Sequence, residues 1–313
     1  MNKIFFEIGG YAVGAILTAF FMKKIFLLIL SFLMLTVTGC GGGTKEDGKL
    51  KIVTSFYPIY LETINIAGNV DGVEVVNLTK PQTGCLHDYQ LTTEDMKTLE
   101  TADIFVVNGL GMENFLDKVT KNLKIVNASY SDEIYLLKDG ENFNPHVWMS
   151  VTYAMAQVRA IQRQLCELDP AHAEEYKKNA LNYLNELASL RDEMHFALDN
   201  LPNKDIVTFH EAFPYFAAEF KLNILGVIER EPGTEPTPQE LIDTVKIVNE
   251  MPVKVLFTEP QYSPKAAETI ARETGAKIFT LDPITTGDSK IENINDYQNK
   301  MLQNMKVLVE ALQ

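Results

Sequence analysis

The sequence contains few cysteines and few basic residues. It has three cysteines in 313 residues, and none of them forms the Cys-x-x-Cys pair of a thiolate zinc site. So few cysteines exclude a disulfide framework. The 28 lysines and arginines are outnumbered by 42 aspartates and glutamates, which gives a net charge of -14. Because such a surface repels nucleic acid, we expect no nucleic-acid partner.

Sequence motifs of several enzyme classes are also missing. No Gly-x-Gly-x-x-Gly follows the first predicted strand, so a dinucleotide-binding domain is not expected. No Gly-x-Ser-x-Gly nucleophile elbow is present. His210-Glu211 begins like a His-Glu-x-x-His motif, but Pro214 occupies the position of the second histidine. We therefore expect no enzymatic activity, with a zinc hydrolase that keeps an open coordination position as a weaker alternative.

The first forty residues have the pattern of a secretory leader. Lys23-Lys24 precedes an apolar run that ends in small residues and Cys40. A basic start, a short apolar stretch and a small-residue cleavage site are typical of a signal peptide. The run is shorter than the ~20 residues of a membrane-spanning helix, which is the alternative interpretation. Residues 1–21 form a second apolar stretch, so Met22 is a candidate for the true start.

The leader ends in Val-Thr-Gly-Cys, which resembles the lipobox of bacterial lipoproteins. In that motif the cysteine is acylated and becomes the first residue of the mature protein. The resemblance implies a leader over residues 1–39, a lipidated Cys40 and a hydrophilic tether over residues 40–50. We therefore expect the protein to be extracytoplasmic and anchored to the outer face of the cell membrane.

Short β-rich runs alternate with segments of helical spacing in both halves of the chain. This alternation is typical of βαβ units and a parallel sheet. The predicted strands lie at 51–56, 73–78, 103–109 and 124–129 in the first half, and at 205–210, 222–228, 254–260 and 277–283 in the second half.

The middle of the chain breaks this alternation with two long helical stretches. The second begins at Pro170, and thirty helical residues would span ~45 Å, more than we expect of one lobe. We predict an α/β protein of two Rossmann-like βα lobes, residues 51–168 and 204–313, joined by a spine helix in residues 169–203. The apolar stripe predicted for this helix is Leu181, Leu184, Leu187 and Leu190.

Three of the five histidines follow predicted strands. His87 lies in the loop after 73–78, His146 lies downstream of 124–129, and His210 ends 205–210. Asp282 follows another strand in the same manner. Open α/β sheets bind ligands at the carboxyl ends of their strands, so these four side chains can converge in the cleft between the lobes. Three imidazoles and one carboxylate suit Zn²⁺.

Weaker roles are predicted for several neighbouring residues. Glu211 and Glu259 are candidate acceptors for the ring N–H groups of the ligands, with ordinary surface or strand-end acids as the alternative. Cys85, two residues before His87, could be a soft ligand, but we interpret it as a small buried thiol. His172 and His195 are interpreted as surface or hydrogen-bonded residues, as is usual for a lone histidine.

These segments resemble those of the zinc- and manganese-binding solute-binding lipoproteins of bacterial metal ABC importers. The loop Thr-Gly-Cys-Leu-His-Asp-Tyr matches the first ligand loop of that family, with Leu86 in place of the usual proline. Asn-Pro-His-Val-Trp-Met, His-Glu-Ala-Phe-Pro and Thr-Leu-Asp-Pro match the segments that carry the other ligands. The resemblance covers essentially the whole mature chain and implies ligand roles for His87, His146, His210 and Asp282.

The resemblance also implies a choice of metal and of partners. Manganese-type members carry a carboxylate at the position of His210, so the histidine favours Zn²⁺ over Mn²⁺. The histidine-rich loop of many zinc-type members is missing, because residues 129–143 contain no histidine. We expect a monomer that delivers Zn²⁺ to an ABC permease with its ATPase subunit. A manganese-binding homologue and a metal-dependent surface adhesin are the alternatives.

Overall fold

Two four-stranded parallel sheets form the framework, and both have the same strand order. The computed structural model describes residues 48–81, 84–86, 89–115, 123–228, 236–261 and 263–313. The first sheet has the order β2-β1-β3-β4 and the second the order β8-β7-β9-β10. Their strands are β1 (Leu50–Thr54), β2 (Val73–Asn77), β3 (Ile104–Val107), β4 (Lys124–Asn127), β7 (Asp205–Thr208), β8 (Asn223–Val227), β9 (Val255–Thr258) and β10 (Lys277–Thr280). The predicted fold of two βα lobes with parallel sheets is confirmed.

The central strands are the most apolar. The four residues of β3, Ile-Phe-Val-Val, are all buried, and so are the four residues of β9, Val-Leu-Phe-Thr. Strands that are covered on both faces read as continuous apolar runs, whereas edge strands keep exposed positions. The edge strands β2, β4, β8 and β10 accordingly include exposed or half-buried residues. Burial thus fixes which strands lie at the centre of each lobe.

Several helices begin and end at clear sequence signals. Thr92 and Asp95 form a capping box at the start of α3 (Thr93–Glu100). Thr237 and Glu240 do the same for α7 (Pro238–Glu250). The other helices of the lobes are α2 (Tyr57–Ala67), α4 (Val151–Leu168), α6 (Pro214–Phe220) and α8 (Lys265–Thr274).

The spine is a 26-residue helix, α5 (Ala173–Leu198), preceded by the 3-10 turn η3 (Pro170–His172). At 1.5 Å per residue it is ~39 Å long. The predicted leucine stripe was only partly right, since Leu181 is 60% exposed. A spacing of three residues drifts off one face of a helix with 3.6 residues per turn. The buried face instead follows Tyr176, Ala180, Tyr183, Leu187, Leu190, Met194 and Leu198.

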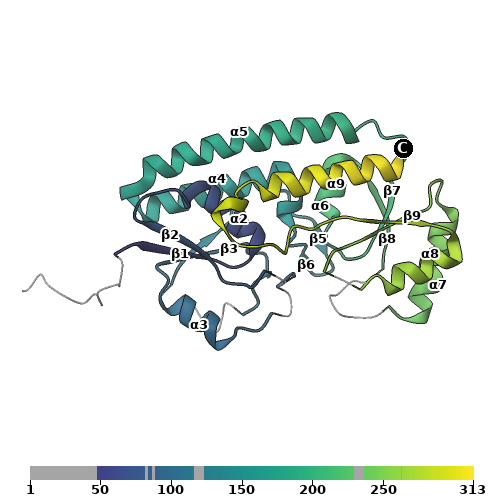
Figure 1. Cartoon of the computed structure of the whole chain (residues 1–313), viewed down its shortest axis with the longest axis horizontal. Coiled ribbons are helices and arrows are strands. Elements are labelled where there is room, and N and C mark those ends of the chain that lie inside the picture. Colours follow the sequence, from purple (N-terminus) through teal and green to yellow (C-terminus); the bar gives the residue numbers. More distant parts are fainter. Residues whose placement is uncertain (1–47, 82–83, 87–88, 116–122, 229–235, 262) are drawn as a thin grey trace, which may run out of the picture. The chain divides into compact units, whose positions relative to one another are not determined.

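The last helix, α9 (Asp296–Leu312), runs beside α5 and also contacts α2 (Figure 1). It follows the short turn η4 (Ile291–Asn293). Tyr57 of α2 donates a hydrogen bond to Asp296, at 2.7 Å, and Asn65 of α2 donates one to the carbonyl of Ile294, at 2.9 Å. The end of the second half of the chain therefore packs against the first half.

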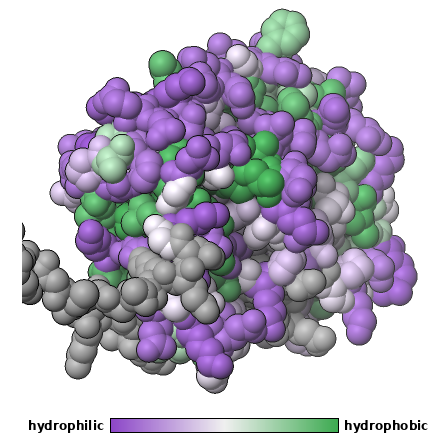
Figure 2. Space-filling model, turned by 60° about the vertical axis from the view of Figure 1, so that its left-hand side comes forward, coloured by the Kyte–Doolittle hydropathy of each residue, from purple (hydrophilic) through white to green (hydrophobic). Residues whose placement is uncertain are grey.

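One hydrophobic cluster includes residues of both sheets together with α2, α5 and α9. Residues Lys49–Gln313 accordingly form one compact unit. Hydrophilic residues cover most of the face drawn in Figure 2, and hydrophobic residues lie between them in small groups. Among the described residues, no helix combines the length and hydrophobicity needed to cross a membrane. The predicted leader, Cys40 and most of the tether lie outside the described residues.

Candidate metal centre

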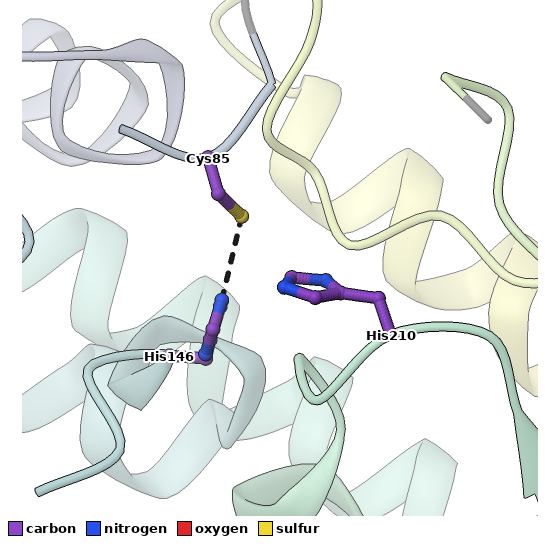
Figure 3. A group of neighbouring side chains, drawn as sticks. All are labelled: Cys85, His146 and His210. Atoms are coloured by element: carbon purple, nitrogen blue, oxygen red, sulfur yellow. Dashed lines mark hydrogen bonds between the residues drawn. The ribbon is translucent and has the colours of Figure 1, made fainter. Parts of the chain in front are cut away.

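Three side chains of metal-ligating type meet at the ends of the strands (Figure 3). They are Cys85, His146 and His210, and their ligand atoms all lie within 4.8 Å of one another. Cys85 follows β2, whereas His210 lies two residues after β7. Both histidines are 2% exposed and the cysteine is half-buried. Within the described parts of the chain, this is the group that could hold a metal ion.

His146 is held in a single orientation by Asn144. The residue follows the hairpin of β5 (Lys138–Asp139) and β6 (Asn142–Phe143) and precedes the 3-10 turn η2 (Val147–Met149). Its backbone N–H donates to Asn144 Oδ1 at 3.0 Å, so that atom must be the amide oxygen. The ring atom Nδ1 lies 3.0 Å from the same oxygen and therefore carries the proton. The lone pair of Nε2 is left to face the cluster.

Hydrogen bonds join the loops that carry the two histidines. The Asn144 amide donates to the carbonyl of Glu211 at 2.9 Å, next to His210 in sequence. The Tyr215 hydroxyl donates to the carbonyl of Asn144, also at 2.9 Å. The Trp148 indole N–H donates to the carbonyl of Pro283 at 2.8 Å. Segments from both lobes therefore fix the His146 loop from several sides.

The loop after β3 also holds the His146 loop, through Pro145. The amide of Asn108 donates to the carbonyl of Pro145 at 2.9 Å. The backbone N–H groups of Asn108 and Gly109 donate to the two carboxylate oxygens of Glu113, at 2.8 and 3.0 Å. Burial raises the pKa of Glu113 to about 7, although these hydrogen bonds act against the shift. Burial and hydrogen bonds hold this turn, and the turn holds Pro145.

Glu259 lies beside the ring of His210. Its Oε2 is 3.6 Å from His210 Nδ1, and its side chain is completely buried. Gln261 donates a hydrogen bond of 2.7 Å to the same oxygen. Burial raises the pKa of Glu259, and contact with His210 opposes that shift. A separation of 3.6 Å is an ion-pair contact and is longer than a hydrogen bond, so the role of Glu259 as an acceptor for the His210 ring stays a prediction.

His210 and Glu259 follow neighbouring strands, β7 and β9. The strand order reverses between β7 and β9, because β8 lies on one side of β7 and β9 lies on the other. Such a switch point leaves a crevice at the carboxyl ends of the strands, where α/β proteins bind ligands. The strand-end placement expected for His210 follows from this topology.

The other predicted ligands are not seen in the cluster. His87 lies outside the described residues. Asp282 is described, but its Oδ1 accepts a 2.7 Å hydrogen bond from the N–H of Ile284 and its Oδ2 is paired with Lys300. The described group of ligand atoms does not include it. Glu211 contributes through its backbone carbonyl. Ligand roles for His87 and Asp282, and a side-chain role for Glu211, stay predictions.

Cys85 is placed differently from the sequence interpretation. It is half-buried rather than buried, and its Sγ lies 3.4 Å from His146 Nε2. No disulfide joins Cys85 to Cys166. A sequence signal was available, because Cys85 lies two residues before His87, which was already a candidate ligand.

The two remaining histidines have local acidic partners. His172 Nδ1 lies 2.6 Å from Asp169 Oδ2, and His195 Nδ1 lies 3.0 Å from Asp199 Oδ1. Both pairs involve residues at the ends of α5 or in the turns beside them. The interpretation of these histidines as hydrogen-bonded residues is confirmed.

Two matching α/β lobes with a cysteine–histidine group at their strand ends define a metal-binding protein of the solute-binding type. Residues 52–311 match the family model of ZnuA, the periplasmic component A of the zinc-uptake complex. The chain belongs to this family. Its members are metal-binding solute-binding proteins and not enzymes, so the hydrolase alternative is set aside.

The chain is similar to characterised relatives that are named for different metals. It is 30% identical to the zinc-binding lipoprotein AdcA of Streptococcus pneumoniae over 313 residues, covering 93% of this chain and 61% of AdcA. The chain thus spans about three fifths of the length of that relative. It is 31% identical to the manganese-binding lipoprotein MntA of Halalkalibacterium halodurans, covering 82% of this chain and 88% of MntA.

Solved structures share the fold. The crystal structure of ZnuA has a TM-score of 0.74 and 28% identity, covering 85% of this chain and all of the other. The laminin-binding protein Lmb of Streptococcus agalactiae, described as bifunctional with adhesin and metal-transporting activity, has a TM-score of 0.74 and 29% identity. The match covers 84% of this chain and 100% of the Lmb chain.

Proposed function

We propose that this protein captures Zn²⁺ outside the cytoplasm and delivers it to an ABC permease served by an ATPase subunit. The observation that carries the proposal is the convergence of two histidine rings and a thiol, with ligand atoms within 4.8 Å of one another. Membership of the zinc-uptake family supports it. The ion is cargo, so the site must bind it reversibly.

The donor set favours zinc over manganese. Imidazole nitrogen and thiol sulfur are ligands of zinc, whereas manganese is bound mainly by carboxylate, carbonyl and water oxygens. Zn²⁺ is usually held by four ligands in a tetrahedron. His87 and Asp282 are proposed, from the family resemblance, as further ligands, and a tetrahedral site that also binds the Cys85 thiol has room for one of them. Asp282 would first have to exchange its partner Lys300 for the ion.

Zinc titration of single variants tests the binding site. Isothermal calorimetry on His146→Ala and His210→Ala should show zinc affinity falling by more than about 100-fold, since a lost ligand costs more than a lost supporting partner. His172→Ala is the matched control, because that ring pairs with Asp169 on the spine. Unchanged affinity in both site variants would overturn the proposal.

Anchoring and delivery need separate tests. We propose that the leader over residues 1–39 is removed and that Cys40 carries the lipid. Metabolic labelling with a radioactive fatty acid should mark the wild type but not Cys40→Ala. A deletion strain should grow poorly under zinc chelation, and both added zinc and the wild-type gene should restore growth. Restoration by manganese in place of zinc would contradict zinc delivery.

A manganese carrier is the second candidate, and the similarity to MntA favours it. The two can be separated by the metal that the purified native protein retains and by competition at the isolated site. If the protein bound as much manganese as zinc in this competition, the manganese candidate would be supported. We expect zinc to displace manganese completely at equimolar concentrations, because nitrogen donors bind zinc more strongly.

A further inference from the structure

We propose that Cys85 is a ligand of the transported ion, and that its thiolate sets the preference of the site for zinc and softer cations over manganese. This inference rests on the proposed metal-binding function and adds the identity of a ligand. It concerns a residue for which the sequence allowed a soft-ligand role but favoured that of a small buried thiol.

The separation of Cys85 and His146 is that of two ligands on one ion. Their Sγ and Nε2 atoms are 3.4 Å apart. Zinc–nitrogen bonds of ~2.0–2.1 Å and zinc–sulfur bonds of ~2.3 Å, at tetrahedral angles, put such a pair about 3.5 Å apart. A zinc ion could therefore bind both atoms with little movement of either side chain.

The directions of the side chains also fit. Because the Nδ1–H group of His146 donates its hydrogen bond to Asn144 Oδ1, the lone pair of Nε2 faces Sγ. Figure 3 shows the His210 ring pointing one nitrogen toward the same space. That nitrogen lies within 4.8 Å of the other two ligand atoms, so closure of the His210 loop by about an ångström completes three coordination positions.

Charge supplies an independent argument. Two neutral imidazoles bring no negative charge to a divalent ion, and the predicted carboxylate ligand, Asp282, is paired with Lys300. Cys85 is the group in the cluster that can become anionic. On binding, the sulfur–metal bond replaces the sulfur–hydrogen bond, and the proton leaves to solvent. The thiolate then neutralises one of the two positive charges.

A thiolate changes which ions the site can hold. Soft sulfur ligands select zinc and cadmium, whereas manganese prefers oxygen ligands. A half-buried thiol can also be reached by an incoming ion, which a fully enclosed one could not. By contrast, the sulfur of Cys166 accepts a hydrogen bond from Gln162 at 3.1 Å and lies on α4, so it provides the matched control.

Cobalt spectroscopy on the mature protein tests the assignment. Co²⁺ replaces zinc at tetrahedral sites, and a thiolate ligand adds a near-ultraviolet charge-transfer band to the visible bands of the bound ion. One equivalent of Co²⁺ should give both signals in the wild type and in Cys166→Ser. Cys85→Ser should keep the visible bands and lose the charge-transfer band. Its zinc affinity should fall by at least about tenfold, and its manganese affinity by less than threefold.

The outcomes separate this inference from the proposed function. The cysteine assignment would be overturned if the wild type gave the visible bands without a charge-transfer band. It would also be overturned if Cys85→Ser kept the charge-transfer band unchanged. Either result would leave zinc capture standing. A wild type that binds neither Co²⁺ nor Zn²⁺ would overturn both. Equal losses of zinc and manganese affinity in Cys85→Ser would overturn the selectivity role.

Discussion

The side-chain oxygen of Asn144 accepts two hydrogen bonds from His146, one from its backbone N–H and one from ring Nδ1, each 3.0 Å long. The first bond identifies the oxygen, and the second therefore identifies the tautomer of the ring. Partners of this kind orient metal-binding histidines and raise their affinity for the ion.

Loss of this acceptor should weaken metal binding. Asn144→Ala removes both hydrogen bonds to His146 and the bond to the Glu211 carbonyl, so we expect zinc affinity to fall about 10–100-fold. Asn144→Asp keeps an acceptor oxygen and should lose less. Zinc calorimetry measures both, with Asn179→Ala as the control, since that amide lies on the spine helix α5 and donates to the carbonyl of Ile66 in α2. Equal affinities for Asn144→Ala and the wild type would contradict the positioning role.

The buried carboxylate of Glu259 should support His210 in a similar way. Glu259→Gln replaces the carboxyl group 3.6 Å from Nδ1 by an amide of the same size. We expect about tenfold weaker zinc binding, at the low end of such effects. The exposed Glu268→Gln on α8 is the control. If both variants bound zinc equally well, Glu259 would have only a packing role.

The pairing of Asp282 with Lys300 allows a test in which a variant binds zinc more tightly. If Asp282 becomes a ligand, then removing its competitor with Lys300→Met should raise zinc affinity about twofold to fivefold, the size of a partly exposed ion pair. Asp282→Asn should lower the affinity instead. Competition with a zinc-sensitive dye measures both changes. No effect of Asp282→Asn would remove that carboxylate from the proposed ligand set.

Glu62 makes stability depend on pH. This α2 residue is 1% exposed, and neither of its carboxylate oxygens has a hydrogen-bond partner among the described residues. Burial raises its pKa well above the ordinary 4.5. The folded state therefore keeps a proton that the unfolded state loses. The resulting stability is complete below pH 4.5 and is lost as pH rises toward the folded pKa.

Urea unfolding at a series of pH values checks this prediction. The contribution of Glu62 should fall by up to about 1.4 kcal/mol per pH unit above the unfolded pKa. Glu62→Gln should remove that slope and be the more stable protein at neutral pH. Glu193→Gln, an exposed residue of α5, should behave as the wild type does. Parallel pH curves for Glu62→Gln and the wild type would show that Glu62 is not the source.

The sequence predicted the sheets well because buried strands leave a local signal. Runs such as Ile104–Val107 are apolar throughout, and the end of β7 then fixes where His210 lies, whereas His146 follows the β5–β6 hairpin. The face of α5 was predicted less well, since Tyr183 takes the buried place expected for Leu184. A tyrosine counts as polar in a simple pattern, although its ring is buried here.

The two features that sequence analysis missed depend on tertiary structure. The docking of α9 on α2 and α5 uses contacts such as Tyr57 with Asp296, which are 239 residues apart. Local periodicity holds no information about such a distant partner. The approach of Cys85 to His146 spans 61 residues and depends on how two loops fold over the strand ends.

Because α9 packs against the first half of the chain, neither half has a complete hydrophobic core by itself. Tyr297 of α9 donates its hydroxyl proton to the carbonyl of Trp148, the residue that packs against the His146 ring. A protein divided after Leu201 should therefore give two fragments that are insoluble apart and regain structure when mixed. The same continuity links the extreme C-terminus to the loop that carries His146.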